Sequence, residues 1–218
     1  MNHPIFLDNE DSWPAEVRKI LECADHYANG QNDSDLVSSV HDALEGQSIV
    51  GYHFTRLTNE EIFSIKRDGL TLLTRDFMEK KLQNAYEQNY ISSNLLQKIQ
   101  ECQNNNVNLS PRFGFSFLYL FPPRPNDPYQ FLRWWGGEAI FNCFCYNDPH
   151  RITLKSIGTP CIVRILIPRD ALKYQTIAGG FVYRFYKNRG QNYPEWSNAE
   201  CSRTLAVYDI IQTDTQDR

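Results

Sequence analysis

The first 47 residues carry the hydrophobic periodicity of amphipathic helices. Apolar residues recur at the i, i+3 and i+4 spacing that places them on one helical face: Val17, Ile20, Leu21 and Ala24. The dipeptide Asn29-Gly30 interrupts the pattern and is typical of a turn. We therefore expect residues 1–47 to form an N-terminal helical cap rather than a domain of their own.

A strand followed by a capped helix is predicted after this cap. The apolar and aromatic run from Ser48 to Phe54 favours a short strand. Thr58 and Glu61 have the spacing of a capping box, in which each side chain accepts a hydrogen bond from the other residue's backbone amide. We place the helix start at Thr58 and its end at Gly69, where a left-handed residue suits glycine. The run Leu70–Leu73 is a second strand candidate.

The rest of the chain alternates helix-compatible and strand-like segments. Residues 76–103 are polar and helix-compatible, and residues 129–141 favour a helix interrupted at Gly136-Gly137. Runs rich in aromatic and β-branched residues predict strands: Phe113–Phe121, Cys161–Ile167, Phe181–Tyr186 and Leu205–Ile211. Internal repeats and low-complexity linkers are absent from the sequence, so we expect one mixed α+β unit over residues 48–218.

Composition narrows the class of protein. The chain has 218 residues, of which 41% are hydrophobic and 22% charged, and this balance excludes a disordered chain. The formal net charge of −4 gives no global attraction to nucleic acid. Neither a long apolar run nor a signal-peptide pattern occurs, so we expect a cytoplasmic protein without membrane association.

The six cysteines favour reduced thiols over a metal site. They are scattered along the chain, and only Cys143 and Cys145 are close in sequence. A CxC pair without a second pair or clustered histidines is a weak zinc signal, and two cysteines on one face of a strand explain it equally well. We expect mostly buried thiols and no bound metal.

The segment that joins the first strand to the capped helix is a candidate binding site. Free backbone amides and loop side chains converge where a strand passes into a helix. There His53 and Thr55 offer hydrogen bonds to ribose hydroxyls, and Arg56 offers a planar fork to a phosphate. The structural alternative is a half-buried histidine bonded to a backbone carbonyl oxygen.

Two glutamates are candidates for an acidic group in such a site. Glu138 follows two tryptophans and two glycines, and an apolar wall can raise the pKa of a neighbouring carboxyl group. Glu200 precedes the last strand-like run, where a carboxylate can stabilise positive charge on a sugar carbon. Each has the alternative of a solvated side chain. The ring of Tyr119 could stack on a ligand in this site, and the structural alternative is that the ring packs in the core.

Taken in order, these segments resemble the ADP-ribosyltransferase fold, particularly the bacterial DarT-like enzymes of the His-Tyr-Glu type. Tyr52–Arg56 and the helix ending in Gly69-Leu70 are similar to the strand and helix that open this fold. Phe113–Phe121 resembles its middle strand, and Asn198–Glu200 resembles the entry to the strand that carries its catalytic glutamate. The resemblance covers residues 48–213 and implies a core of two small mixed or antiparallel sheets with helices.

The resemblance implies an enzyme that binds NAD as a substrate and cleaves the bond between nicotinamide and ribose. Glu200 or Glu138 would then be catalytic and stabilise an oxocarbenium-like ribose, with no metal required. The implied NAD site consists of four residues: His53, Thr55, Arg56 and Tyr119. The implied acceptor is a nucleic acid, a protein or water, so we expect a bacterial toxin or antiviral defence enzyme, with an antitoxin as a further partner.

Two departures from the family's pattern leave alternatives open. Ser-Thr-Ser and Glu-x-Glu signatures are absent from the sequence, which argues against the arginine-modifying branch, and Glu138 competes with Glu200 for the catalytic role. A second hypothesis is a non-catalytic partner-binding protein, such as an immunity or antitoxin factor with its tryptophan pair as an interface hot spot. A third is a metal-independent hydrolase that uses His53 and a carboxylate as acid and base.

Overall fold

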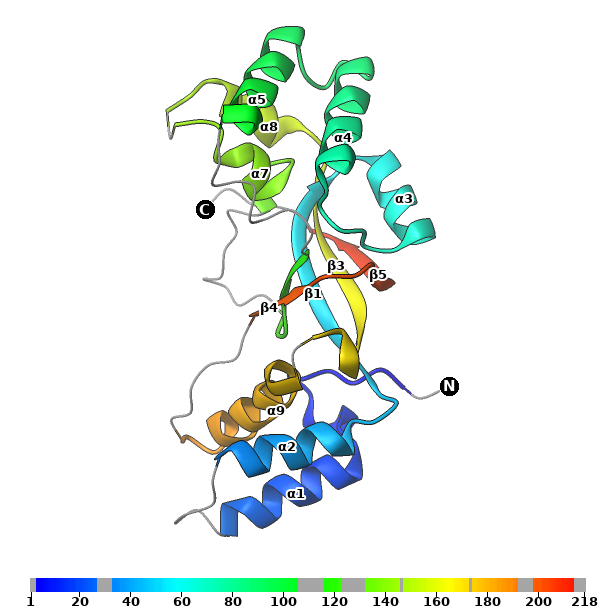
Figure 1. The fold of residues 1–218 in the computed structure, drawn as a ribbon, viewed down its shortest axis with the longest axis vertical. Coiled ribbons are helices and arrows are strands. Elements are labelled where there is room, and N and C mark those ends of the chain that lie inside the picture. Colours follow the sequence, from blue (N-terminus) through cyan, green and yellow to red (C-terminus); the bar gives the residue numbers. More distant parts are fainter. Residues whose placement is uncertain are drawn as a thin grey trace. The chain divides into compact units, whose positions relative to one another are not determined.

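A computed structural model describes most of the chain: residues 3–26, 33–105, 116–122, 132–145, 147–172, 174–191 and 198–213. Over these residues the protein is mixed α and β, with eight α-helices and one five-stranded sheet (Figure 1). The chain divides into two compact units. Unit 1 consists of Met1–His53, Phe117–Pro122 and Arg164–Cys201, and unit 2 consists of Phe54–Ser116, Pro123–Val163 and Ser202–Arg218. The division predicted from the sequence, with a cap over residues 1–47 and one α+β unit over residues 48–218, stays a prediction.

The sheet has the strand order β4-β2-β1-β3-β5. The strands are β1 (Ser48–Leu57), β2 (Ser116–Tyr119), β3 (Thr159–Pro168), β4 (Asn198–Cys201) and β5 (Ala206–Gln212). Strands β1 and β2 are antiparallel, with Tyr52 opposite Tyr119. The described strands form one sheet, where the resemblance led us to expect two. The long strands β1 and β3 pair at the centre of this sheet, β2 and β5 flank them, and β4 joins through β2.

Helices α1 (Ala15–His26), α2 (Asp33–Ala43) and α9 (Tyr174–Asn188) belong to unit 1. Helix α2 packs against both α1 and α9 (Figure 1). The periodic residues Val17, Leu21 and Ala24 are buried, which confirms the helical reading of this segment. The predicted turn at Asn29-Gly30 lies outside the described residues.

The predicted strand Phe181–Tyr186 is wrong, because this segment belongs to helix α9. Phe181 and Val182 are buried together with Ile177, Ala178 and Phe185. Their spacing of three and four residues is that of a helix face, and it becomes visible only in a window that begins before the aromatic run. A short apolar run alone does not distinguish a buried helix from a strand.

Five helices of unit 2 are described: α3 (Asn59–Asp68), α4 (Arg75–Glu87), α5 (Ser93–Asn105), α7 (Gly137–Phe141) and α8 (His150–Ser156). Helices α4, α5, α7 and α8 contribute to one apolar cluster, in which Leu82, Ile99, Ile140 and Leu154 are fully buried. The helix-compatible segment 76–103 thus forms two helices, α4 and α5. The interruption predicted at Gly136-Gly137 is confirmed, since φ is 86° and 60° at these residues.

The other predicted strands have mixed outcomes. Cys161–Ile167 and Leu205–Ile211 are confirmed as most of β3 and β5. Phe113–Phe121 contains β2, although its residues 113–115 lie outside the described part. Leu70–Leu73 is not a strand, because only Leu70 pairs, through an isolated bridge to Leu205. No helix in the described ranges is long and apolar enough to cross a membrane.

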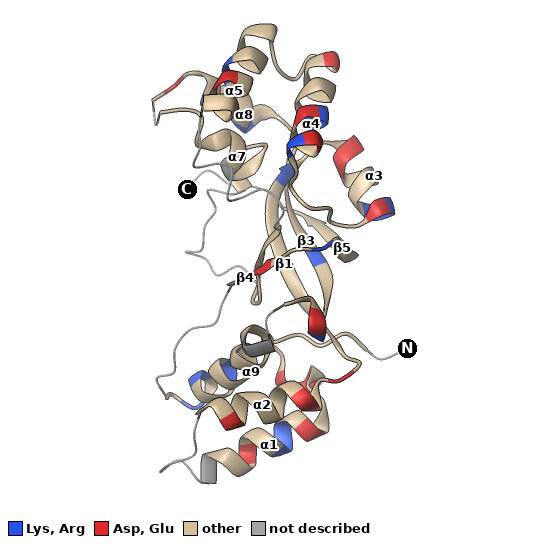
Figure 2. Cartoon of the chain, viewed as in Figure 1, with Lys and Arg blue, Asp and Glu red and all other residues tan. Residues whose placement is uncertain are grey.

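The capping box of α3 is confirmed. The Thr58 hydroxyl accepts a hydrogen bond from the Glu61 amide at 3.3 Å, and the Glu61 carboxylate accepts one from the Thr58 amide at 2.8 Å. Acidic residues lie in the first turn and basic residues in the last turn, which suits the helix dipole (Figure 2). Gly69 ends the helix with φ 85° and ψ 176°, a region that is essentially restricted to glycine but is not the left-handed helical one.

We expect Thr58→Ala to lower the free energy of unfolding by about 1 kcal/mol, because the Glu61 amide loses its acceptor. Urea titration measures this change. Thr58→Ser is the matched control, since it keeps the hydroxyl and should retain most of the stability. Equal destabilisation by both variants would contradict the assignment of the hydroxyl as the stabilising group.

Candidate functional site

Arg56 lies inside unit 2 and not at a ligand surface. Its side chain is buried, and its Nε, Nη1 and Nη2 atoms donate to the carbonyl oxygens of Ile157, Leu132 and Gly158 at 3.0, 3.2 and 2.6 Å. Burial lowers the pKa of this guanidinium below its ordinary value. The predicted pyrophosphate contact of Arg56 is therefore replaced by a structural role, because its fork is already occupied by backbone acceptors.

His53 is half-buried on the central strand β1, and its ring is oriented by a backbone group. Its Nδ1 lies 2.9 Å from the carbonyl oxygen of Phe117 on β2. Since a carbonyl oxygen can only accept, Nδ1 carries a proton in this bond, and Nε2 of the neutral ring is then an acceptor. The structural alternative stated for this histidine is thus observed, and it fixes the tautomer that a ligand would meet.

His53 and Tyr119 project from opposite faces of the sheet. Tyr119 is directly opposite Tyr52 on the antiparallel partner strand, so these two side chains share a face. Successive side chains of a strand alternate between faces, which places His53 on the other one. Tyr119 instead packs edge-to-face on Phe117, with ring centroids 5.3 Å apart. The sequence-based grouping of His53 with Tyr119 in one pocket is therefore wrong.

Thr55 also has little room for a ligand. It is buried, and its hydroxyl makes a long hydrogen bond of 3.4 Å to the carbonyl oxygen of the following residue, Arg56. A ribose hydroxyl could reach a buried threonine only after the surrounding side chains had moved. Of the four residues assigned to the NAD site, His53 alone keeps a geometry that suits a ribose contact.

The two candidate glutamates lie on different elements. Glu200 is exposed on β4, between the buried residues Ala199 and Cys201. It belongs to unit 1, as does His53, and β2 separates their two strands. The axes of β4 and β1 are therefore two strand spacings apart, which is about 10 Å in the plane of the sheet. Glu138 lies on α7 in unit 2, and its side chain is outside the described part of the structure.

A polar cluster in unit 1 was missed by the sequence reasoning. Burial and the neighbouring carboxylate of Asp8 raise the pKa of the Tyr52 hydroxyl, which is hydrogen-bonded to Asp8, while the positive charge of Arg164 opposes this shift. One oxygen of Asp8, Oδ1, is buried without a hydrogen-bond partner among the described residues. Residues 8, 52 and 164 are far apart in sequence, and no local motif could have brought them together.

A second missed cluster surrounds Glu61 in unit 2. Its carboxylate accepts hydrogen bonds from the Trp135 indole at 3.0 and 3.2 Å and forms an ion pair with Lys81. The Lys81 ammonium also lies 4.6 Å from the centre of the Trp135 ring. Glu61 thus joins α3, α4 and the segment before α7. Both oxygens of this carboxylate therefore have a donor within hydrogen-bond distance.

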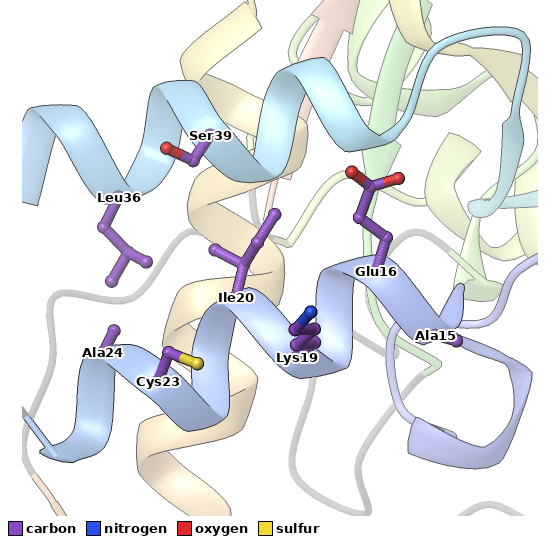
Figure 3. A pocket seen from close by; sticks show the side chains of 8 residues that line it. All are labelled: Ala15, Glu16, Lys19, Ile20, Cys23, Ala24, Leu36 and Ser39. Carbon is purple, nitrogen blue, oxygen red and sulfur yellow. The ribbon is translucent and has the colours of Figure 1, made fainter.

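A groove lies between α1 and α2 in unit 1. It has a volume of about 600 Å³, and Figure 3 shows Ile20 and Leu36 pointing into the space between the two helices. Glu16 and Lys19 lie along its rim, and the thiol of Cys23 also lines it. None of the six predicted site residues is among those that line this groove. It is a candidate contact surface and lies apart from the proposed chemistry.

The cysteines are all free thiols, but only Cys161 and Cys201 are buried, so the expectation of mostly buried thiols is wrong. The CxC pair lies in the turns that follow α7 and not on a strand. Across the described ranges, no group of three or more histidine, cysteine, aspartate or glutamate side chains could hold a metal ion.

Comparisons of the chain with protein-family models, with curated proteins and with solved structures found no match.

Proposed function

We propose that this protein is an NAD-dependent ADP-ribosyltransferase that uses His53 and an acidic residue, with Glu200 as the first candidate. The observation that carries the proposal is the junction of β1 and α3. There a half-buried histidine of fixed tautomer stands on the central strand, and a capped helix ending in Gly69-Leu70 follows. This strand, helix and glycine are the elements on which the resemblance to the ADP-ribosyltransferases rests.

The expected chemistry is heterolysis of the bond between ribose C1′ and the nicotinamide nitrogen. Both electrons of the bond leave with nicotinamide, and the ribose becomes an oxocarbenium-like cation. The carboxylate of Glu200 would stabilise this cation, and Nε2 of His53 would accept a hydrogen bond from a ribose hydroxyl. A nucleophile of the acceptor, or water, then bonds to C1′ and loses a proton.

Three of the four residues assigned to the NAD site have no place in the proposed one. Arg56 is occupied by carbonyl oxygens, Thr55 is buried, and Tyr119 projects from the other face of the sheet. Pyrophosphate recognition must therefore come from other groups. The acceptor class, nucleic acid or protein, and a role as a toxin or defence enzyme remain part of the proposal.

The release of free nicotinamide from NAD by the purified full chain tests this function. We expect Glu200→Gln to lower the rate by about 100-fold, since the electrostatic stabilisation of the cation is lost. We expect His53→Ala to lower it by about 10-fold, with the loss of one ribose hydrogen bond. Glu45→Gln, at an exposed glutamate after α2, is the matched control and should leave the rate unchanged.

The variants also decide between the two glutamates. A large loss in Glu138→Gln, with Glu200→Gln still active, would move the catalytic role to α7. If the parent protein released nicotinamide and neither glutamine variant lost activity, both assignments would be wrong. If the parent released none, the enzyme proposal would fall, and the groove between α1 and α2 would favour the partner-binding hypothesis.

A further inference from the structure

The groove between α1 and α2 is lined by apolar and small side chains. Ile20 of α1 and Leu36 of α2 point into the space between the two helices (Figure 3). Ala15, Ala24 and Ser39 also line the groove, and their side chains are short. Its volume is about 600 Å³. An apolar groove between two helices is a surface that can accept the apolar face of a third helix.

The segment that contains most of this groove is acidic. Residues 20–55 contain six aspartates and glutamates and no lysine or arginine, so their formal charge is −6, whereas that of the whole chain is −4. Figure 2 shows aspartates but no lysine or arginine on α2. A surface of one charge attracts a partner of the opposite charge.

Two acidic residues of α2 lie along the groove. Ser39 lines it, Asp35 precedes Ser39 by four residues, and Asp42 follows Ser39 by three, so the three side chains share one face of the helix. Both aspartates are exposed, and neither has an ion-pair partner within the part of the chain that the structure describes. Their negative charges are therefore open to a partner.

The α1 side of the groove is balanced in charge. Glu16 and Lys19 both line it and lie one helical turn apart. The charge preference of the groove is therefore set by α2. A helix bound in the groove should carry its basic residues on the side that faces α2.

We propose that this groove binds a basic amphipathic helix of another protein, with apolar residues on Ile20 and Leu36 and lysines or arginines beside Asp35 and Asp42. The apolar groove and the unpaired acidic side chains carry this inference together. A second copy of the chain is a poorer occupant, because it would bring the same acidic surface against this one. The inference concerns unit 1 alone and does not depend on the function proposed above.

The test measures the binding of three fluorescein-labelled helical peptides to the full chain by fluorescence anisotropy. The first peptide has about 15 residues, with leucines at i, i+4 and i+7 spacing and lysines on both flanks. The second has glutamate in place of lysine, and the third has serine in place of leucine. We expect the first to bind at least about 10-fold more tightly than the others, because it alone has both the apolar anchors and the positive charge. Added salt should weaken this binding.

Variants of the full chain locate the binding site. Asp35→Lys and Asp42→Lys should each weaken the binding of the first peptide by about 5-fold, and Lys19→Glu should strengthen it by about 2-fold. Ile20→Lys should weaken it by about 30-fold, since an apolar anchor of the groove is lost. Glu79→Lys is the matched control. It makes the same change of charge as Asp35→Lys at an exposed position of α4 in unit 2, and it should leave the affinity unchanged.

The Cys23 thiol gives a measurement that needs no substitution. This thiol is exposed and lines the groove. At a peptide concentration about ten times Kd, the first peptide should slow its alkylation by iodoacetamide by about 10-fold. Cys145, which is exposed in unit 2, should react at an unchanged rate in the same sample.

Five results would overturn the inference. The first is no binding of the lysine and leucine peptide. Equal binding of the glutamate peptide would remove the charge preference, and equal binding of the serine peptide would leave only an unspecific acidic surface. Unchanged binding in Ile20→Lys, with Cys23 unprotected, would place the peptide elsewhere. A dimer of the full chain in light scattering that Ile20→Lys dissociates would make a second copy the occupant.

Discussion

Replacing Arg56 with methionine is expected to lower the free energy of unfolding by about 4 kcal/mol, or Tm by roughly 10 °C. Methionine retains much of the volume and none of the hydrogen bonds. The carbonyl oxygens of Leu132, Ile157 and Gly158 would each lose a charged donor, and an unsatisfied buried carbonyl costs about 1–3 kcal/mol. Urea titration followed by circular dichroism measures the loss.

The control for this variant is Arg67→Met. Arg67 is exposed on α3, where it pairs with its neighbour Asp68 and lies over the exposed Phe63 ring, so its replacement should not change the denaturation midpoint measurably. Equal stability of the two variants would mean that the three carbonyl bonds contribute nothing. The Arg56 guanidinium would then again be a candidate phosphate ligand.

Gly158→Ala is expected to cost about 3 kcal/mol. At this glycine φ is +64°, and an added Cβ would lie 2.5 Å from both the carbonyl carbon and the carbonyl oxygen of Leu57. These atoms belong to the backbone at the end of β1, so no side chain can rotate away to make room. The carbonyl oxygen of Gly158 also holds Nη2 of Arg56, and a backbone shift would weaken that bond as well.

Gly46→Ala is the control that separates the cost of the steric contact at Gly158 from the cost of a positive φ for alanine. Gly46 has φ +70°, and a Cβ there would meet nothing within 4 Å. Its cost should be close to 1 kcal/mol, which is the penalty of a left-handed conformation for alanine. Denaturation curves of the two variants give the difference directly. A Gly158→Ala protein as stable as Gly46→Ala would show that β1 moves freely at Leu57.

The parts of the fold that sequence reasoning predicted are those set by local chemistry. The capping box needs only Thr58 and Glu61, three residues apart, and the strand at Cys161–Ile167 has its own β-branched pattern. The failure at Phe181–Tyr186 has the opposite cause. Its aromatic residues have a high strand propensity, but the burial of α9 against the rest of unit 1 decided the outcome.

The candidate site was less predictable, because register and long-range contacts decide it. The sequence placed His53 and Tyr119 on two strands, but only the pairing of Tyr52 with Tyr119 reveals that they face opposite ways. The burial of Arg56 could not be predicted from the sequence either. Its three acceptors follow about 75 to 100 residues later in the chain, and no spacing rule connects a strand residue with such distant carbonyl groups.

Helix α3 contains no buried residue, although it begins with a saturated cap and ends at a glycine beside Leu205. Hydrogen bonds hold this helix at its two ends, and every residue between them is exposed or only half-buried. Amide protons in its middle turns should therefore exchange with deuterated solvent through local opening, well before those of the neighbouring α4, whose Met78 and Leu82 are buried.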